Sequence, residues 1–164
     1  MVLSLMTQLP TPTATNVDAV YSELAPQLMS FATGLVGRDD APDVVSTAVL
    51  KALSSPGWPE VRNHRAYLHR AIFNEAQTLG RRNRQRRERE LRIVGRDRWE
   101  LPAFEPEVRR AVEELSMRQR AVIVLTYWAD LDPPTIADHL GISEGAVRRH
   151  LARARGQLRK VLHA

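Results

Sequence analysis

Residues 134–151 read PTIADHLGISEGAVRRHL, which gives two short segments of helical pattern on either side of Gly141. Pro134 suits the first turn of a helix, where its missing N–H leaves no bond unmade. Apolar residues then recur at the three-and-four spacing of one helix face. Gly141 can take the left-handed conformation that ends a helix, and the Ser143 hydroxyl can cap the next one. The pattern predicts two helices joined by a tight turn.

The second of these helices extends well beyond the turn. Its apolar residues recur at helical spacing and predict an inward face of Val147, Leu151, Ala154 and Leu158. The small residues Ala137 and Gly141 would let the two helices cross closely, as a helix-turn-helix requires. Because such a unit places its second helix in the major groove, the sequence predicts a DNA-binding domain.

The outward face of the predicted recognition helix is rich in arginine. Small side chains between the arginines would let the helix backbone approach the groove. An arginine there can bond the guanine O6 and N7 atoms or pair with a phosphate, and the sequence does not assign these roles. The residues at the start of the helix could bond phosphate or only cap. The candidate DNA contacts are Ser143, Glu144, Arg148, Arg149, Ala152, Arg153 and Arg155.

The remainder of the chain favours an all-α fold of two small helical domains joined by a flexible linker. The 164 residues lack the alternating Val, Ile and Thr runs of strands. We expect a disordered tail at 1–16, a first domain at 17–90, a linker at 91–105 and a second domain at 106–164.

The expected helices follow from local pattern. The first is expected at 17–36, broken or bent near Pro26, and the second at 41–53, capped by Asp39 or Asp40. Asn63 would cap a third helix that runs into an arginine-rich stretch. In the second domain, helices are expected at 106–115 and 117–128, with Ser116 capping the latter.

Basic charge is concentrated in two places. Residues 81–98 carry nine arginines against three acids, and residues 144–164 carry five arginines and Lys160 against one acid. Residues 1–80 are slightly acidic. Two separate basic segments predict two nucleic-acid contacts in one chain, whereas the alternative is a solvated charged surface.

The loop around Trp58 precedes the basic helix. An exposed tryptophan beside basic residues suits stacking on an unpaired base. Packing of Trp58 onto the core is an equally good interpretation. Asn74, within the predicted helix, is expected to have a polar partner because asparagine disfavours helix interiors.

Enzymatic signatures are absent from the sequence. The five histidines show no metal-ligand spacing, and no phosphate-cradling glycine loop or nucleophile elbow occurs. We therefore expect no catalytic residue, no metal site, no cofactor and no small-molecule substrate. The absence of cysteine excludes thiolate chemistry and fits a cytoplasmic location. No apolar run is long enough to span a membrane, so no membrane partner is expected.

The two halves together resemble an extracytoplasmic-function (ECF) bacterial RNA polymerase sigma factor of the two-domain type. Residues 40–53 look like that family's polymerase-clamp-binding helix, and residues 63–76 look like the helix that faces the −10 promoter element. Residues 115–125, followed by 136–147, are similar to the domain that reads the −35 element.

The resemblance implies partners and site residues. The partners would be core RNA polymerase, promoter DNA and, where one exists, an anti-sigma factor. The polymerase-binding residues implied are Asp40, Asp43, Val44, Thr47 and Lys51. The −10 contacts implied are Trp58, Asn63, Arg65, Arg70, Asn74, Arg81 and Arg82. The candidate contacts of the recognition helix would serve the −35 element.

Two alternatives stay open. One is a helix-turn-helix regulator of the response-regulator type, although the first half shows no α/β alternation. The other is a sigma-like protein that binds polymerase without initiating transcription. Ser46 and Thr47 keep this second alternative open, because the family usually has a Gln-Glu pair at those positions.

Overall fold

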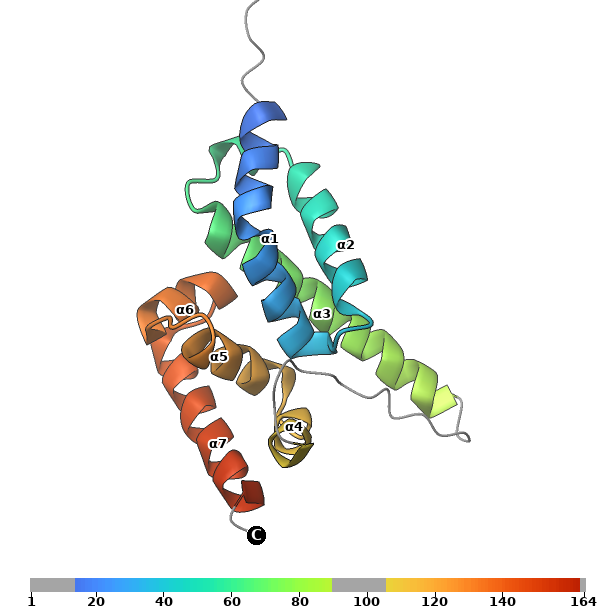
Figure 1. The fold of residues 1–164 in the computed structure, drawn as a ribbon, viewed down its shortest axis with the longest axis vertical. Helices are drawn as coiled ribbons and strands as arrows, with labels where there is room; N and C mark the ends of the chain where they lie inside the picture. The colour runs from blue at the N-terminus through green and yellow to red at the C-terminus, as the bar shows by residue number, and fades with distance from the viewer. Residues whose placement is uncertain (1–13, 90–105, 163–164) are drawn as a thin grey trace, which may run out of the picture.

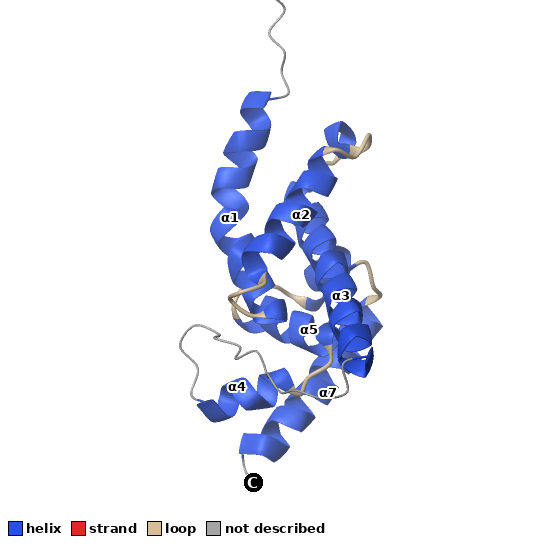
Figure 2. Ribbon diagram, turned by 90° about the vertical axis from the view of Figure 1, so that its right-hand side faces the viewer, coloured by secondary structure: helices blue, strands red, loops and turns tan. Residues whose placement is uncertain are grey.

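The computed structural model describes residues 14–89 and 106–162, and within them all regular structure is helical, as predicted (Figure 2). The first half forms α1 (Ala14–Val36), α2 (Ala41–Leu53), the short 3₁₀ helix η1 (Trp58–Glu60) and α3 (His64–Arg89). The second half forms α4 (Pro106–Glu113), α5 (Met117–Tyr127), α6 (Pro133–Leu140) and α7 (Glu144–Leu162). Figure 1 shows α1, α2 and α3 packed together, with α4 to α7 against one end of them. No helix in the described ranges is long and apolar enough to cross a membrane.

Helix α1 differs from the expectation at two points. It begins at Ala14, three residues earlier than expected, and it continues across Pro26 without a break. Pro26 is exposed, whereas Leu28 and Phe31 on the opposite side are buried. Burial of that apolar face offsets the single backbone bond that proline cannot make. Most of the predicted tail and the predicted linker lie outside the described residues.

Local signals set the helix ends in the second half. Ser116 and Gln119 form a reciprocal capping box at the start of α5. The Asp132 carboxylate accepts a bond from the Thr135 N–H, so α6 starts at Pro133, one residue before the expected opening. Gly141 ends α6 in the left-handed conformation, with φ of 64°. These ends confirm the two-helix unit with its tight turn.

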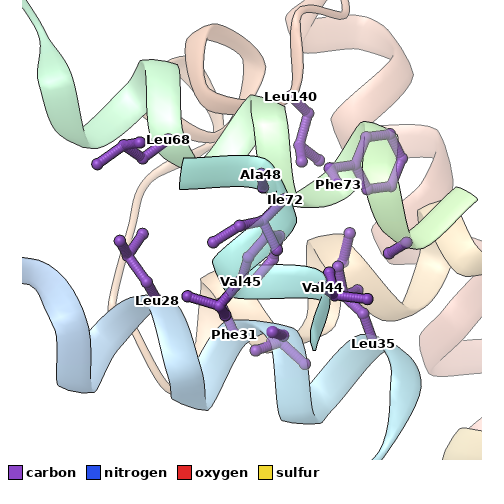
Figure 3. Packing of buried hydrophobic residues seen from close by; sticks show 14 of the residues in the cluster. Leu28, Phe31, Leu35, Val44, Val45, Ala48, Leu68, Ile72, Phe73 and Leu140 are labelled. Atoms are coloured by element: carbon purple, nitrogen blue, oxygen red, sulfur yellow. The ribbon is translucent and has the colours of Figure 1, made fainter. Parts of the chain in front are cut away.

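One apolar core runs through both halves. Side chains from α1, α2 and α3 pack with Val122 and Leu125 of α5, Leu140 of α6 and Val147 of α7. Figure 3 shows Leu140 directed towards Phe73 of α3. Helix α1 lies on α5 and α3 lies on α6. The two predicted domains are therefore packed against each other in this structure.

The two halves approach each other closely at Gly34 of α1. A Cβ atom added there would lie 2.7 Å from Cγ2 of Val124, which is closer than carbon atoms pack. Only glycine lets α5 approach α1 to this distance.

Arg120 of α5 also joins the two halves. Its side chain is 6% exposed and donates to four backbone carbonyl oxygens. Its Nη1 lies 2.7 Å from the carbonyl oxygen of Leu35 at the end of α1. The other three bonds go to Val112, Glu113 and Leu115, where α4 ends. One buried guanidinium thus satisfies carbonyls at the ends of two helices.

Candidate nucleic-acid interface

The outward face of α7 has the predicted composition. Arg149 and Arg153, four residues apart, are exposed, and so are the small residues Gly145 and Ala152. A Cβ atom added at Gly145 would meet nothing within 4 Å, so the surface around it is open. On the opposite face, Val147 and Ala154 are fully buried. The helix therefore presents an arginine face while its apolar face is held in the core.

Other predicted residues of α7 have partners within the chain. The Ser143 hydroxyl accepts from the Ala146 N–H, which supports the capping role. Arg148 forms an ion pair with Glu144 one turn earlier. Nε of Arg155 donates to the Tyr127 hydroxyl at 2.8 Å. Arg149 and Arg153 are therefore the stronger candidates for base contacts.

The start of α3 faces the second half of the chain. Asn63 caps α3 through its Oδ1 atom, and its Nδ2 lies 3.5 Å from a carboxylate oxygen of Asp138 on α6. Nη2 of Arg70 donates to the Asp138 carbonyl oxygen at 2.5 Å. The Arg70 guanidinium also lies against Gly141, where an added Cβ would approach within 3.1 Å. Two predicted −10 contacts therefore bind α6 in this structure.

Aromatic rings also pack together where α3 meets α6. The rings of His69 on α3 and His139 on α6 are stacked with centroids 4.9 Å apart, and Phe31 of α1 lies 5.0 Å from His69. Nδ1 of His69 pairs with the Arg65 carbonyl oxygen at 2.8 Å. Burial, opposed in part by this bond, lowers the pKa of His69 to about 4. Burial also lowers the pKa of His139, so both rings are neutral near pH 7.

The structure contradicts the DNA-stacking role of Trp58. Its side chain is 6% exposed and packs on His64 and Tyr67, with ring centroids 4.8 and 5.8 Å away. The short helix η1 turns the ring into the core. The alternative interpretation, that Trp58 packs the loop onto the core, is the one the structure supports.

A cavity of about 390 Å³ lies between α2 and α3. Its lining includes Tyr67 and three of the predicted residues, Lys51, Arg70 and Asn74. Its volume falls within the range of ligand sites in proteins, and its lining combines an aromatic ring with polar groups. Tyr67, and not Trp58, is therefore the aromatic side chain that lines this cavity.

The remaining basic residues of the prediction lie on α3 as well. Arg65 is half-buried, and its Nε atom is buried without a hydrogen-bond partner. Arg81 and Arg82 are exposed further along the helix. Arg81 donates to the Thr78 hydroxyl at 3.2 Å.

The predicted polymerase-binding surface lies on α2, with one correction. Asp43 is exposed, Asp40 and Thr47 are half-buried, and Lys51 pairs with Glu75 at 2.6 Å. Val44 is 3% exposed because it belongs to the face of α2 that packs into the core, so it is not a contact residue.

Several residues of the interface were not predicted from the sequence. Leu50 of α2 is 65% exposed, which makes it the most exposed large apolar side chain among the described residues. The sequence could have indicated this exposure, because Leu50 lies outside the apolar positions of α2 that are expected to face inward. Nothing in the sequence indicated the contacts of Asp138 or of the His69–His139 pair, because these contacts join residues about seventy positions apart.

Among the described residues, no group of three His, Cys, Asp or Glu side chains could hold a metal ion. The side chains described above include cationic, aromatic and amide groups, which suit the recognition of an anionic polymer with exposed bases.

Comparison with known proteins agrees with this geometry. Residues 106–158 match the family described as Sigma-70, region 4. The fold is similar to that of the sigma factor RpoE from Bartonella quintana, solved in complex with the anti-sigma factor NepR: 21% identity, TM-score 0.72, covering 92% of this chain and 99% of that one. It is also similar to CnrH, solved in complex with the cytosolic domain of CnrY: 23% identity, TM-score 0.65, covering 93% and 90%. A comparison with curated proteins found no match.

The predicted resemblance to sigma factors is confirmed at two levels. Residues 106–158 match the Sigma-70, region 4 family, and nearly the whole chain has a fold similar to that of the two sigma factors named above.

Proposed function

We propose that this chain is an ECF sigma factor that binds core RNA polymerase and directs promoter-specific initiation through −10 and −35 contacts. The observation that carries the proposal is the exposed arginine face of α7, within a sigma-70 region 4 domain, on the same chain as the basic helix α3. The protein acts by binding, in the cytoplasm, and the catalysis belongs to the polymerase. An anti-sigma factor is a further proposed partner, as one is bound to RpoE of similar fold.

Helix α7 would read the −35 element as duplex DNA. Its inner face is held by the core, so the exposed face can enter a major groove as one rigid element. Arg149 and Arg153 are one turn apart and reach neighbouring base pairs or phosphates. The open surface at Gly145 allows the backbone to come close.

Loss of either arginine is expected to weaken binding to a −35 duplex. The variants Arg149→Ala and Arg153→Ala should each lose about 1–3 kcal/mol of binding free energy and relax the base preference at one position. Fluorescence anisotropy with a set of duplexes measures both effects. Arg159→Ala is the matched control, because it removes the same charge from the same helix about 15 Å away from Arg149. A loss no larger than in this control would remove both arginines from base reading.

The cavity between α2 and α3 would hold an unpaired base of the −10 element. Tyr67 provides a ring for stacking, and the amide of Asn74 can bond the edge of a base. Lys51 and Arg70 on the same lining would attract the phosphate backbone. The exposed Arg81 and Arg82 would continue the backbone contact along α3.

The exposed side of α2 would dock on the polymerase. It presents the carboxylate of Asp43 and the apolar side chain of Leu50, with Thr47 between them. An apolar contact within a polar rim is the usual composition of a protein interface.

Run-off transcription with core polymerase and a library of genomic fragments tests the proposal. The wild-type chain should produce promoter-dependent transcripts, and Asp43→Arg should abolish them while duplex binding by α7 persists. Pull-down with core polymerase then separates the alternatives. Polymerase binding without any transcript would indicate the non-initiating sigma-like protein, and duplex binding without polymerase binding would indicate a helix-turn-helix regulator.

A further inference from the structure

We propose that a cavity between α1, α3 and the end of α5 binds a small aromatic carboxylate, whose charge pairs with Arg65 while its ring lies against Phe31 and Trp128. The ligand would be bound and not transformed. This goes beyond the proposed function, whose partners are all macromolecules. The cavity has a volume of about 310 Å³, which is at the lower end of the range for ligand sites in proteins. A ligand of one or two fused rings suits that size.

The inner wall of the cavity is apolar. It contains Phe31 of α1, which is 2% exposed, and Leu125 of α5, which is fully buried. His69 of α3 belongs to the same wall, and its ring centroid lies 5.0 Å from that of Phe31 with the two planes tilted by 55°. Tilted and offset arrangements are those that aromatic rings prefer, so a third ring can pack beside this pair.

Arg65 carries the only charge among the described residues that line the cavity. Its Nε atom is buried without a hydrogen-bond partner, and none of the ion pairs between described residues includes it. A buried donor without an acceptor costs free energy, which an acceptor from a ligand would restore. A carboxylate presents two oxygens in the planar geometry that a guanidinium matches.

His69 does not add a second positive charge. Its Nδ1 lies 2.8 Å from the carbonyl oxygen of Arg65, and because a carbonyl oxygen only accepts, Nδ1 carries the proton. Burial lowers the pKa of His69 to about 4, so the ring is neutral at pH 7. One carboxylate would therefore balance the charge of Arg65. A phosphate group, with a charge near −2, would leave an excess negative charge beside an apolar wall.

The mouth of the cavity is polar and open to solvent. Gln27 and Ser30 of α1 line it and are exposed, and their amide and hydroxyl groups are able to donate to a carboxylate oxygen. Trp128 lines the same mouth with 48% of its surface exposed. The cavity therefore combines an entrance with hydrogen-bond donors and an apolar interior.

The backbone that carries Trp128 is held in place. Its N–H donates to the carbonyl oxygen of Val124 at 3.0 Å, and the Leu131 N–H donates to that of Leu125 at 3.0 Å. Between these bonds Asp130 takes the left-handed conformation, with φ of 50°, which aspartate tolerates better than most residues. A wall that is already ordered loses little conformational entropy when a ligand binds.

Isothermal titration calorimetry of the full chain with naphthalene-2-carboxylate tests the proposal. Wild type should bind one equivalent with a dissociation constant of about 1 mM or lower. Arg65→Met keeps most of the side-chain volume and should bind roughly tenfold more weakly. Arg62→Met, at an exposed arginine just before α3, is the matched control and should bind as wild type does. Absence of saturable binding by wild type in this range would overturn the proposal.

Two further ligands separate the charge from the ring. Naphthalene-2-carboxamide has the same shape without the charge, so it should bind wild type and Arg65→Met equally and weakly. An equal fall in affinity for both naphthalene ligands in Arg65→Met would contradict the pairing of Arg65 with the carboxylate. Octanoate carries the same charge on a flexible chain and should bind more weakly than the naphthalene carboxylate. Tighter binding of octanoate would overturn the aromatic assignment.

A second pair of variants locates the site without changing Arg65. Ser30→Phe places a ring at the mouth and should weaken binding of naphthalene-2-carboxylate roughly tenfold or more, whereas Ser22→Phe, outside the described lining on the same helix, should not. Both serines are exposed, so the fold should tolerate either change. Wild-type affinity in Ser30→Phe would overturn the proposal. These assays contain neither DNA nor polymerase, so their outcome is independent of the sigma-factor proposal.

Discussion

Replacement of Arg120 with methionine is expected to lower the free energy of unfolding by about 3–5 kcal/mol. The substitution removes the donor from four carbonyl oxygens, of which that of Leu35 belongs to the other half of the chain. A buried acceptor without a partner costs about 1–3 kcal/mol, and the apolar replacement keeps water out of the space. Burial lowers the pKa of Arg120 to about 10, so the lost group is charged at neutral pH.

Urea denaturation and thermal unfolding measure this effect. The midpoint temperature should fall by about 10 °C, at roughly 2–4 °C per kcal/mol for a chain of this size. Arg118→Met is the matched control, because Arg118 is exposed on the same helix, and its change should stay within about 0.5 kcal/mol. Arg120→Lys should rescue only part of the loss, since one ammonium cannot span the carbonyls of both helices. Equal stability of the two methionine variants would contradict the assignment.

Acidification is expected to destabilise the protein through His69. Its pKa of about 4 in the folded chain lies below the usual 6.5, so the unfolded chain takes up this proton first as the pH falls. The contribution of the neutral His69 to the free energy of unfolding is complete above pH 6.5 and is lost as the pH falls from 6.5 to 4. The size of the shift corresponds to about 3 kcal/mol over that range.

A difference measurement isolates this contribution, because His139 and His150 also have lowered pKa values. Urea midpoints of wild type and His69→Gln should be compared at half-unit steps from pH 7 to 4. The wild-type curve should fall more steeply than that of the variant throughout the window. Parallel curves would show that His69 does not titrate as its burial requires. His64→Gln, with a half-buried imidazole on the same helix, serves as the control.

The parts of the fold that sequence predicted well are those set by near neighbours. The turn at Gly141 and the cap at Ser143 depend on residues within one helical turn, and both occur in the structure. The outward placement of Arg149 and Arg153 follows from helical spacing alone. Local rules therefore suffice for the helix-turn-helix and for most helix ends.

The packing of the two halves could not be predicted in this way. A glycine at position 34 looks like any helix glycine until α5 is placed beside it. Arginine usually lies at the surface. Arg120 can be buried because it bonds to carbonyl oxygens that lack a partner within their own helix, and these occur only where helices end. Trp58 and Val44 were misassigned for the same reason, since the faces they occupy are defined by distant segments.

The shared core has a consequence for synthesis of the chain on the ribosome. Phe31 and Leu35 are made about 90 residues before Val124 and Leu125, which cover them in the finished structure. At typical elongation rates of about 5–20 residues per second, the first half waits roughly 5–20 s with this apolar surface uncovered. Nascent first halves should therefore attract chaperones during that interval, and slow codons between the halves would lengthen it.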